Sequence, residues 1–162
     1  MSARYFKEMI NMTKKQAPGE TILKVGGMLL LFLGVMLAFG SSNTFSLVTR
    51  GSADSAVIEY LQQNNMTYDQ LIASTVMVLT AGIIYLAAGV VGVKQAGNIQ
   101  NAGMCVGMGI LLIAEVIAEV IVTINFGEFD PASVIRMLMF PAIYMVGAVL
   151  NWQAKVGEKA GK

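Results

Sequence analysis

The chain contains no histidine, and only one of its 162 residues, Cys105, is a cysteine. The lack of histidine excludes imidazole-based metal sites, histidine general bases and the usual proton switch near neutral pH. A single thiol excludes a disulfide within the chain, so any loop must be held by packing. The sequence also has no Ser/His/Asp constellation, phosphate-binding loop or dinucleotide fingerprint. We therefore expect a protein that is not an enzyme and that uses no metal or other cofactor.

Charge is scarce as well. Charged residues make up 13% of the chain, whereas soluble domains carry about 25%. The net charge of +1 gives no bulk attraction to nucleic acid. In place of charge, 56% of the residues are hydrophobic, and they occur in long runs. A membrane-spanning helix needs about 20 mostly apolar residues. The composition therefore predicts an all-α integral membrane protein whose surroundings are a lipid bilayer.

Four apolar runs are long enough to cross a membrane. We predict spans at about 22–40, 68–93, 103–126 and 132–152. The short connections around the third span make it antiparallel to both neighbours, so residues 21–152 are expected to form one antiparallel four-helix bundle. Pro141 predicts a kink in the fourth span. The polar tail, 153–162, is expected to be disordered.

The N-terminal residues 1–20 are basic and partly amphipathic. Tyr5, Phe6, Met9 and Ile10 share a helical face, and lysines and an arginine surround them. This pattern favours a short interfacial helix on anionic lipid; the alternative is a basic tail that only sets topology. Residues 25–39 could also belong to a cleaved signal peptide, because a small-residue sequence ends at Gly40. The 24 residues ahead of that run favour a retained span.

The loop between the first two spans is the only long one. Residues 41–52 are rich in turn-forming side chains, and a short amphipathic helix is predicted over about 53–65. Thr67 and Gln70 then have the spacing of a capping box, which predicts the start of the second span. Asn65-Met66-Thr67 also fits a glycosylation sequon, a pattern with little specificity by itself.

Basic residues predict the orientation of the spans. Nine of the 11 lie between the N-terminus and Lys24, in the turn after the second span or in the C-terminal tail; Arg50 and Arg136 are the exceptions. The positive-inside rule then predicts a multi-pass protein of the cell membrane with both termini in the cytoplasm.

Two carboxylates inside the third span are the best candidates for function. Glu115 and Glu119 are one helical turn apart, and Thr123 extends the same face. Intramembrane carboxylates are costly and usually face a bundle interior, a partner or a wet cavity. We expect Arg136 to pair with Glu119. The candidate ion- or proton-binding residues are Glu115, Glu119, Thr123, Arg136, Tyr85 and Tyr144.

Small residues mark candidate helix contacts. Gly82 and Gly89 share a face of the second span, and Gly103 and Gly107 form a GxxxG pair at the start of the third. Both patterns allow close helix approach, and we expect the second pair to pack on the second span.

The methionines of the third and fourth spans raise the possibility of a copper site. Two groups lie on the third and fourth spans, where soft sulfur ligands could select Cu(I). They are Met104, Cys105 and Met108, and Met137, Met139 and Met145. Because the groups lie at opposite ends, apart from Met145, gap-filling in the core is the favoured interpretation.

These features lead to two hypotheses. The first is a non-enzymatic four-span membrane protein that acts by helix–helix assembly, either as a homo-oligomer or with another membrane protein. The alternative is a small cation- or proton-coupled transporter that uses the intramembrane glutamates.

Overall fold

The computed structural model describes residues 17–126 and 131–160, and this part of the chain is helical apart from short turns. The elements are α2 (Glu20–Arg50), α3 (Ser55–Gln63), α4 (Tyr68–Gln95), the 3-10 turn η1 (Ile99–Asn101), α5 (Ala102–Phe126) and α6 (Pro131–Ala160). The four long helices are each long and apolar enough to span a membrane, as in a multi-pass membrane protein. The predicted N-terminal interfacial helix lies outside the described residues.

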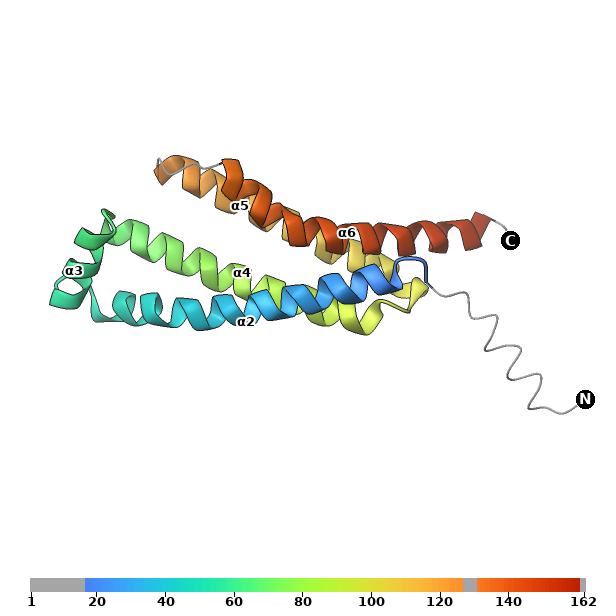
Figure 1. The fold of residues 1–162 in the computed structure, drawn as a ribbon, viewed down its shortest axis with the longest axis horizontal. Helices are drawn as coiled ribbons and strands as arrows, with labels where there is room; N and C mark the ends of the chain where they lie inside the picture. Colours follow the sequence, from blue (N-terminus) through green and yellow to red (C-terminus); the bar gives the residue numbers. More distant parts are fainter. Residues whose placement is uncertain (1–16, 127–130, 161–162) are drawn as a thin grey trace, which may run out of the picture.

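The four long helices form two hairpins. α2 lies beside α4, with α3 across one end, and α5 lies beside α6 (Figure 1). The hairpins pack closely at the end where α2 begins and α6 ends, which we call the base. Toward α3, at the end that we call the tip, they diverge (Figure 1). The two long helices of each hairpin run in opposite directions (Figure 1).

Glycines bring α2 and α4 into close contact. A Cβ added to Gly89 would lie 2.6 Å from Leu31 Cγ and 2.7 Å from Gly27 O, and one added to Gly34 would lie 2.8 Å from Leu86 Cγ. Gly82 faces the same partner less tightly, with Gly34 O at 3.5 Å. The glycine stripe predicted on the second span therefore packs against the first, where bare backbone lets two helices approach.

One asparagine joins three segments at the base. Asn151 of α6 is fully buried, and its Oδ1 accepts a hydrogen bond from Gly19 N at 2.8 Å. Its Nδ2 donates to Ala96 O, also at 2.8 Å. Nearby, a Cβ on Gly147 would lie 2.6 Å from Leu23 N, so α6 contacts the start of α2 directly. The two hairpins are thus connected by polar bonds and by close backbone packing.

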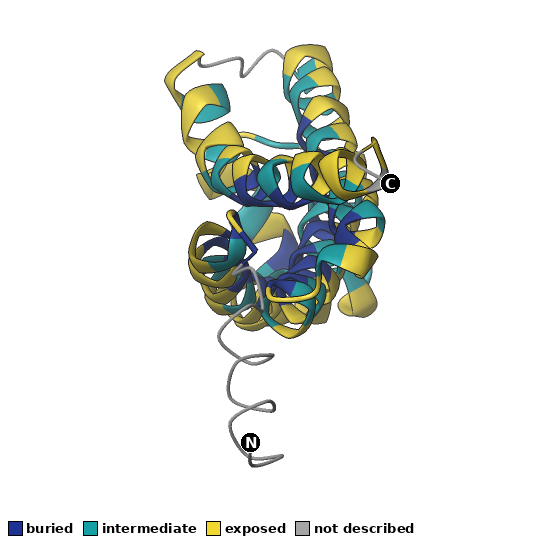
Figure 2. Ribbon diagram, turned by 90° about the vertical axis from the view of Figure 1, so that its right-hand side faces the viewer, coloured by how far each residue is buried: buried dark blue, intermediate teal, exposed yellow. Residues whose placement is uncertain are grey.

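Apolar side chains fill the interior of the bundle and also cover much of its outer surface. In the view from the base, buried residues face inward between the helices and exposed ones face out (Figure 2). The fully buried Tyr144, Leu23 and Leu112 are core members, whereas Phe39 is 73% exposed and Ile135 is 72% exposed. Large exposed apolar side chains on all four long helices are what a lipid-facing surface requires.

The first span is longer than predicted. Residues 41–50 were expected to form part of a turn-rich loop, but α2 continues through them to Arg50. The reason is that Ser41, Ser42 and Thr44 donate their hydroxyl hydrogen bonds to carbonyls three residues earlier. Their polar groups are satisfied on the helix itself, so they do not end it.

The tip follows the predicted pattern more closely. α3 is present, and Asp54 caps it by accepting a hydrogen bond from Ala56 N. The predicted capping box before α4 is confirmed, because Gln70 N donates to Thr67 Oγ1 and Thr67 N donates to Gln70 Oε1. The Tyr68 hydroxyl donates a hydrogen bond to Val48 O, which joins the start of α4 to the end of α2.

The prediction of a disordered tail after residue 152 is wrong for the part that the structure describes. α6 continues to Ala160, and Lys155 Nζ donates a hydrogen bond to Gln100 O, which joins this extension to η1. Pro141 lies inside the helix, and α6 bends along its course (Figure 1), as expected where a proline removes a backbone hydrogen bond.

Replacing Asn151 by alanine is expected to destabilise the bundle by roughly 2–4 kcal/mol, because two buried backbone groups lose their partners. Unfolding by sodium dodecyl sulfate in mixed micelles measures this change. Asn101→Ala is the matched control, since the Asn101 side chain bonds only at the exposed surface. Equal stability of the two variants would contradict the role given to Asn151.

Candidate functional site

Glu115 and Glu119 lie one turn apart on α5 but face different pockets. Glu115 is 8% exposed, and Glu119 is half-buried. Glu115 lines a pocket between α4 and α5, which we call the side pocket. Glu119 lines a pocket formed by all four long helices where the two hairpins meet, which we call the hairpin pocket. Met77 of α4 lines both, so the pockets adjoin.

The side pocket contains a carboxylate oxygen without a partner. Its volume is about 320 Å³, and Oε2 of Glu115 is buried with no hydrogen-bond partner among the described residues. Thr80 is the other polar lining residue, but its hydroxyl donates to Val76 O. The lining residues are Val76, Met77, Thr80, Ile84, Leu111, Ala114, Glu115 and Ala118. A buried polar atom without a partner is costly, so this position calls for a proton, a ligand or a neighbouring molecule.

All four spans line the hairpin pocket, which has a volume of about 240 Å³. Glu119, Tyr85 and Arg136 bring polar groups to walls that are otherwise apolar. The lining residues are Leu33, Leu37, Met77, Val78, Ala81, Tyr85, Glu119, Arg136, Met137 and Phe140. The pocket therefore joins three of the six candidate residues that the sequence indicated.

The ion pair expected between Arg136 and Glu119 is not formed, although both side chains line the same pocket. Within the described residues, the observed salt bridge is between Lys24 and Glu20, at 2.6 Å. Arg136 instead donates from Nε to Ala132 O at 3.3 Å and from Nη2 to Ser133 Oγ at 3.1 Å. Its guanidinium is thus held along its own helix.

Thr123 and Tyr144, two of the candidate binding residues, lie outside the pockets of Glu115 and Glu119. The Thr123 hydroxyl donates to Glu119 O at 2.9 Å, so it is satisfied by the helix backbone. Tyr144 is fully buried in the core, where its ring fills the space beside Gly92 and Gly109. No hydrogen bond from Tyr144 to Glu115 is present among the described residues. Neither residue lines either of the two glutamate pockets.

The GxxxG pair at the start of α5 does not contact the second span as expected. A Cβ on Gly103 would lie 3.0 Å from the Trp152 ring of α6, and one on Gly107 meets no atom within 4 Å in the described part of the chain. The tightly packed glycine of this segment is Gly109, against Met145 of α6. Gly107 is therefore an open position on the surface of α5.

Sequence reasoning missed the small-residue face of α5. Gly107, Leu111, Ala114 and Ala118 are all exposed, and their spacings of four, three and four place them on one side of the helix. The last three also line the side pocket beside Glu115. The spacing of Gly107, Ala114 and Ala118 is visible in the sequence, but only the fold shows that this side is uncovered.

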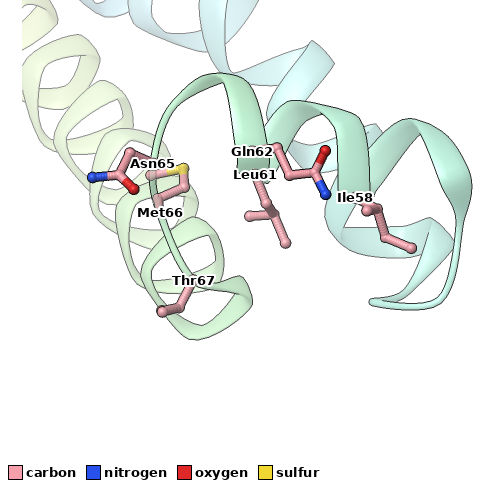
Figure 3. A pocket seen from close by; sticks show the side chains of 6 residues that line it. All are labelled: Ile58, Leu61, Gln62, Asn65, Met66 and Thr67. Carbon is pink, nitrogen blue, oxygen red and sulfur yellow. The ribbon is translucent and has the colours of Figure 1, made fainter.

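A third pocket lies at the tip and offers no charged group. Ile58, Leu61 and Gln62 of α3 face the turn formed by Asn65, Met66 and Thr67 (Figure 3). Its volume is about 360 Å³. Asn65 has a φ of 50°, in the left-handed region that asparagine tolerates. The pocket follows from the tight connection between α3 and α4.

No protein-family model matches the chain, and the comparisons with curated proteins and with solved structures give no match either.

Proposed function

We propose that this four-span membrane protein acts without catalysis, through helix–helix assembly with a second copy of itself. The observation that carries the proposal is the buried Oε2 of Glu115, which has no hydrogen-bond partner within the described part of the chain, beside the exposed small-residue face of α5. The face and the side pocket adjoin, because Leu111, Ala114 and Ala118 belong to both. A helix packed on this face would close the pocket.

The face of α5 suits another helix better than lipid alone. Gly107 leaves the backbone bare, with no atom within 4 Å of an added Cβ in the described residues. Ala114 and Ala118 continue the face with short side chains, and Leu111 is its one large side chain. Small residues at such spacing permit the close backbone approach on which helix association in membranes depends. A two-fold dimer uses the same patch on both subunits, and a stripe of small residues is complementary to itself.

Glu115 gives this contact a polar element. Lipid tails have no hydrogen-bonding groups, so a carboxyl group in a pocket open to lipid is not satisfied there. A second α5 over the side pocket excludes lipid and brings a second Glu115 close to the first. Two carboxyl groups that share protons can bond to each other. The pair would then specify the register of the dimer, as isolated polar groups do in other helix interfaces.

We also propose the orientation that the basic residues indicate: the cell membrane, with both termini in the cytoplasm. With Cys105 replaced by serine, a cysteine at Asn64, in the exposed turn at the tip, is expected to react with a membrane-impermeant maleimide in intact cells. A cysteine at Gly157, exposed near the end of α6, should react only after lysis. The reverse pattern would contradict the orientation.

Gly107→Leu is expected to weaken self-association by about tenfold or more, because the added side chain separates the two helices. Single-molecule photobleaching in lipid bilayers measures the dimer fraction over a range of protein densities. Gly40→Leu is the matched control, since Gly40 is another exposed helix position with no atom within 4 Å of an added Cβ in the described chain. Equal dimer fractions for the two variants would refute the α5 contact.

Transport is the second candidate function, and the adjoining pockets of Glu115 and Glu119 favour it. Two carboxylates that face neighbouring pockets could pass a proton or a small cation between them. The assembly proposal instead expects proteoliposomes with the unaltered protein to show no more pH-driven cation flux than empty liposomes. Flux that disappears in both Glu115→Gln and Glu119→Gln, with the dimer fraction unchanged, would establish transport and displace assembly as the main activity.

A further inference from the structure

The hairpin pocket has the construction of a small-molecule site, and its properties do not depend on whether two chains associate. It lies between the hairpins, and side chains from α2, α4, α5 and α6 line it. Its wall is apolar over most of its area, as in ligand pockets generally, and a small number of polar groups converge on it. Leu33 and Val78 belong to the apolar wall, and Glu119 and Tyr85 are two of the residues that supply polar groups.

Glu119 requires a positive partner or a proton in this setting. A carboxylate surrounded by apolar side chains is costly unless it is neutralised, paired or hydrogen-bonded. Arg136 lines the same pocket, but its Nε and Nη2 donate to Ala132 O and Ser133 Oγ. Among the described residues there is no ion pair between Arg136 and Glu119. A bound cation can supply the missing charge.

Two aromatic residues favour an organic cation over an inorganic one. Tyr85 of α4 and Phe140 of α6 both line the pocket, and the faces of aromatic rings attract ammonium groups. A metal ion such as Ca²⁺ needs about six or more oxygen ligands, and the part of the chain that the structure describes has no cluster of three metal-ligating His, Cys, Asp or Glu residues. The apolar wall adds a surface for a hydrocarbon body.

We infer that the hairpin pocket binds a compact molecule with an ammonium group on an apolar body, the ammonium beside Glu119 and the body against the apolar wall. The volume of about 240 Å³ equals that of roughly eight water molecules at about 30 Å³ each. A single aromatic ring with a short aminoalkyl chain has a suitable size. The ammonium group can belong to a simple amine cation or to a zwitterion, and only the zwitterion would also use Arg136.

Binding of 2-phenylethylamine to the full chain in nanodiscs tests this inference, with isothermal titration calorimetry as the measurement. The neutral isostere 2-phenylethanol measures partition into lipid and apolar contact without charge. We expect the amine to bind at least about tenfold more tightly than the alcohol, and Glu119→Gln to remove that preference. Glu59→Gln, an exposed change on α3, is the matched control and should retain it.

Phe140→Leu keeps the apolar wall but removes a ring, so it should lower affinity for the amine by about threefold and leave the alcohol unchanged. The free amino acid phenylalanine, used as a third probe, distinguishes a zwitterionic ligand from a simple amine cation. If it binds more tightly than the amine, and Arg136→Gln removes that advantage, the ligand is a zwitterion held by the same ammonium contact. If it binds more weakly, the ligand is a simple amine cation.

Equal affinity for amine and alcohol in the unaltered protein would overturn the inference, as would a preference for the amine that survives Glu119→Gln. These outcomes are separate from those of the assembly proposal, because ligand affinity is measured here and the dimer fraction there. Thermal unfolding of each variant in the same nanodiscs confirms that it is folded. A Phe140→Leu protein that is folded and retains full preference for the amine would remove the aromatic part of the argument.

Discussion

The hydrogen bonds of Asn151 are the constraint on which the arrangement of the two hairpins depends. The side chain is fully buried, and it satisfies the backbone at Gly19 and at Ala96 at the same time. Both bonded groups belong to the first hairpin, while Asn151 belongs to the second. Because the side chain is fully buried, water does not compete for these bonds. They hold the hairpins together at the base, whereas the tip diverges.

The divergence toward the tip creates the pockets. At the base, glycines such as Gly147 and Gly92 bring helix backbones and rings together. Further toward the tip, Leu33 and Phe140 line a cavity. Glu119 and Arg136 line the same cavity. The tight base and the pockets nearer the tip are therefore two parts of one architecture.

The glutamates illustrate how one helical turn can separate two roles. Glu115 and Glu119 are one turn apart on α5, yet Glu115 lines a pocket formed by α4 and α5 alone, while Glu119 lines a pocket formed by all four long helices. Helical spacing predicts that they are close. It does not predict what lies opposite each of them, because that depends on where α4 and α6 cross α5.

The sequence by itself determined the helical class, the four spans, the capping box at Thr67 and the presence of carboxylates in the third span. Apolar runs and local capping are properties of neighbouring residues, so no tertiary contact is needed to recognise them. Tertiary structure decided which partner each side chain meets. Arg136 bonds to Ser133 instead of Glu119, and Gly107 is open where a contact with α4 was expected. These outcomes depend on the rotation of each helix about its axis and on the distance between helices, which sequence periodicity leaves undefined.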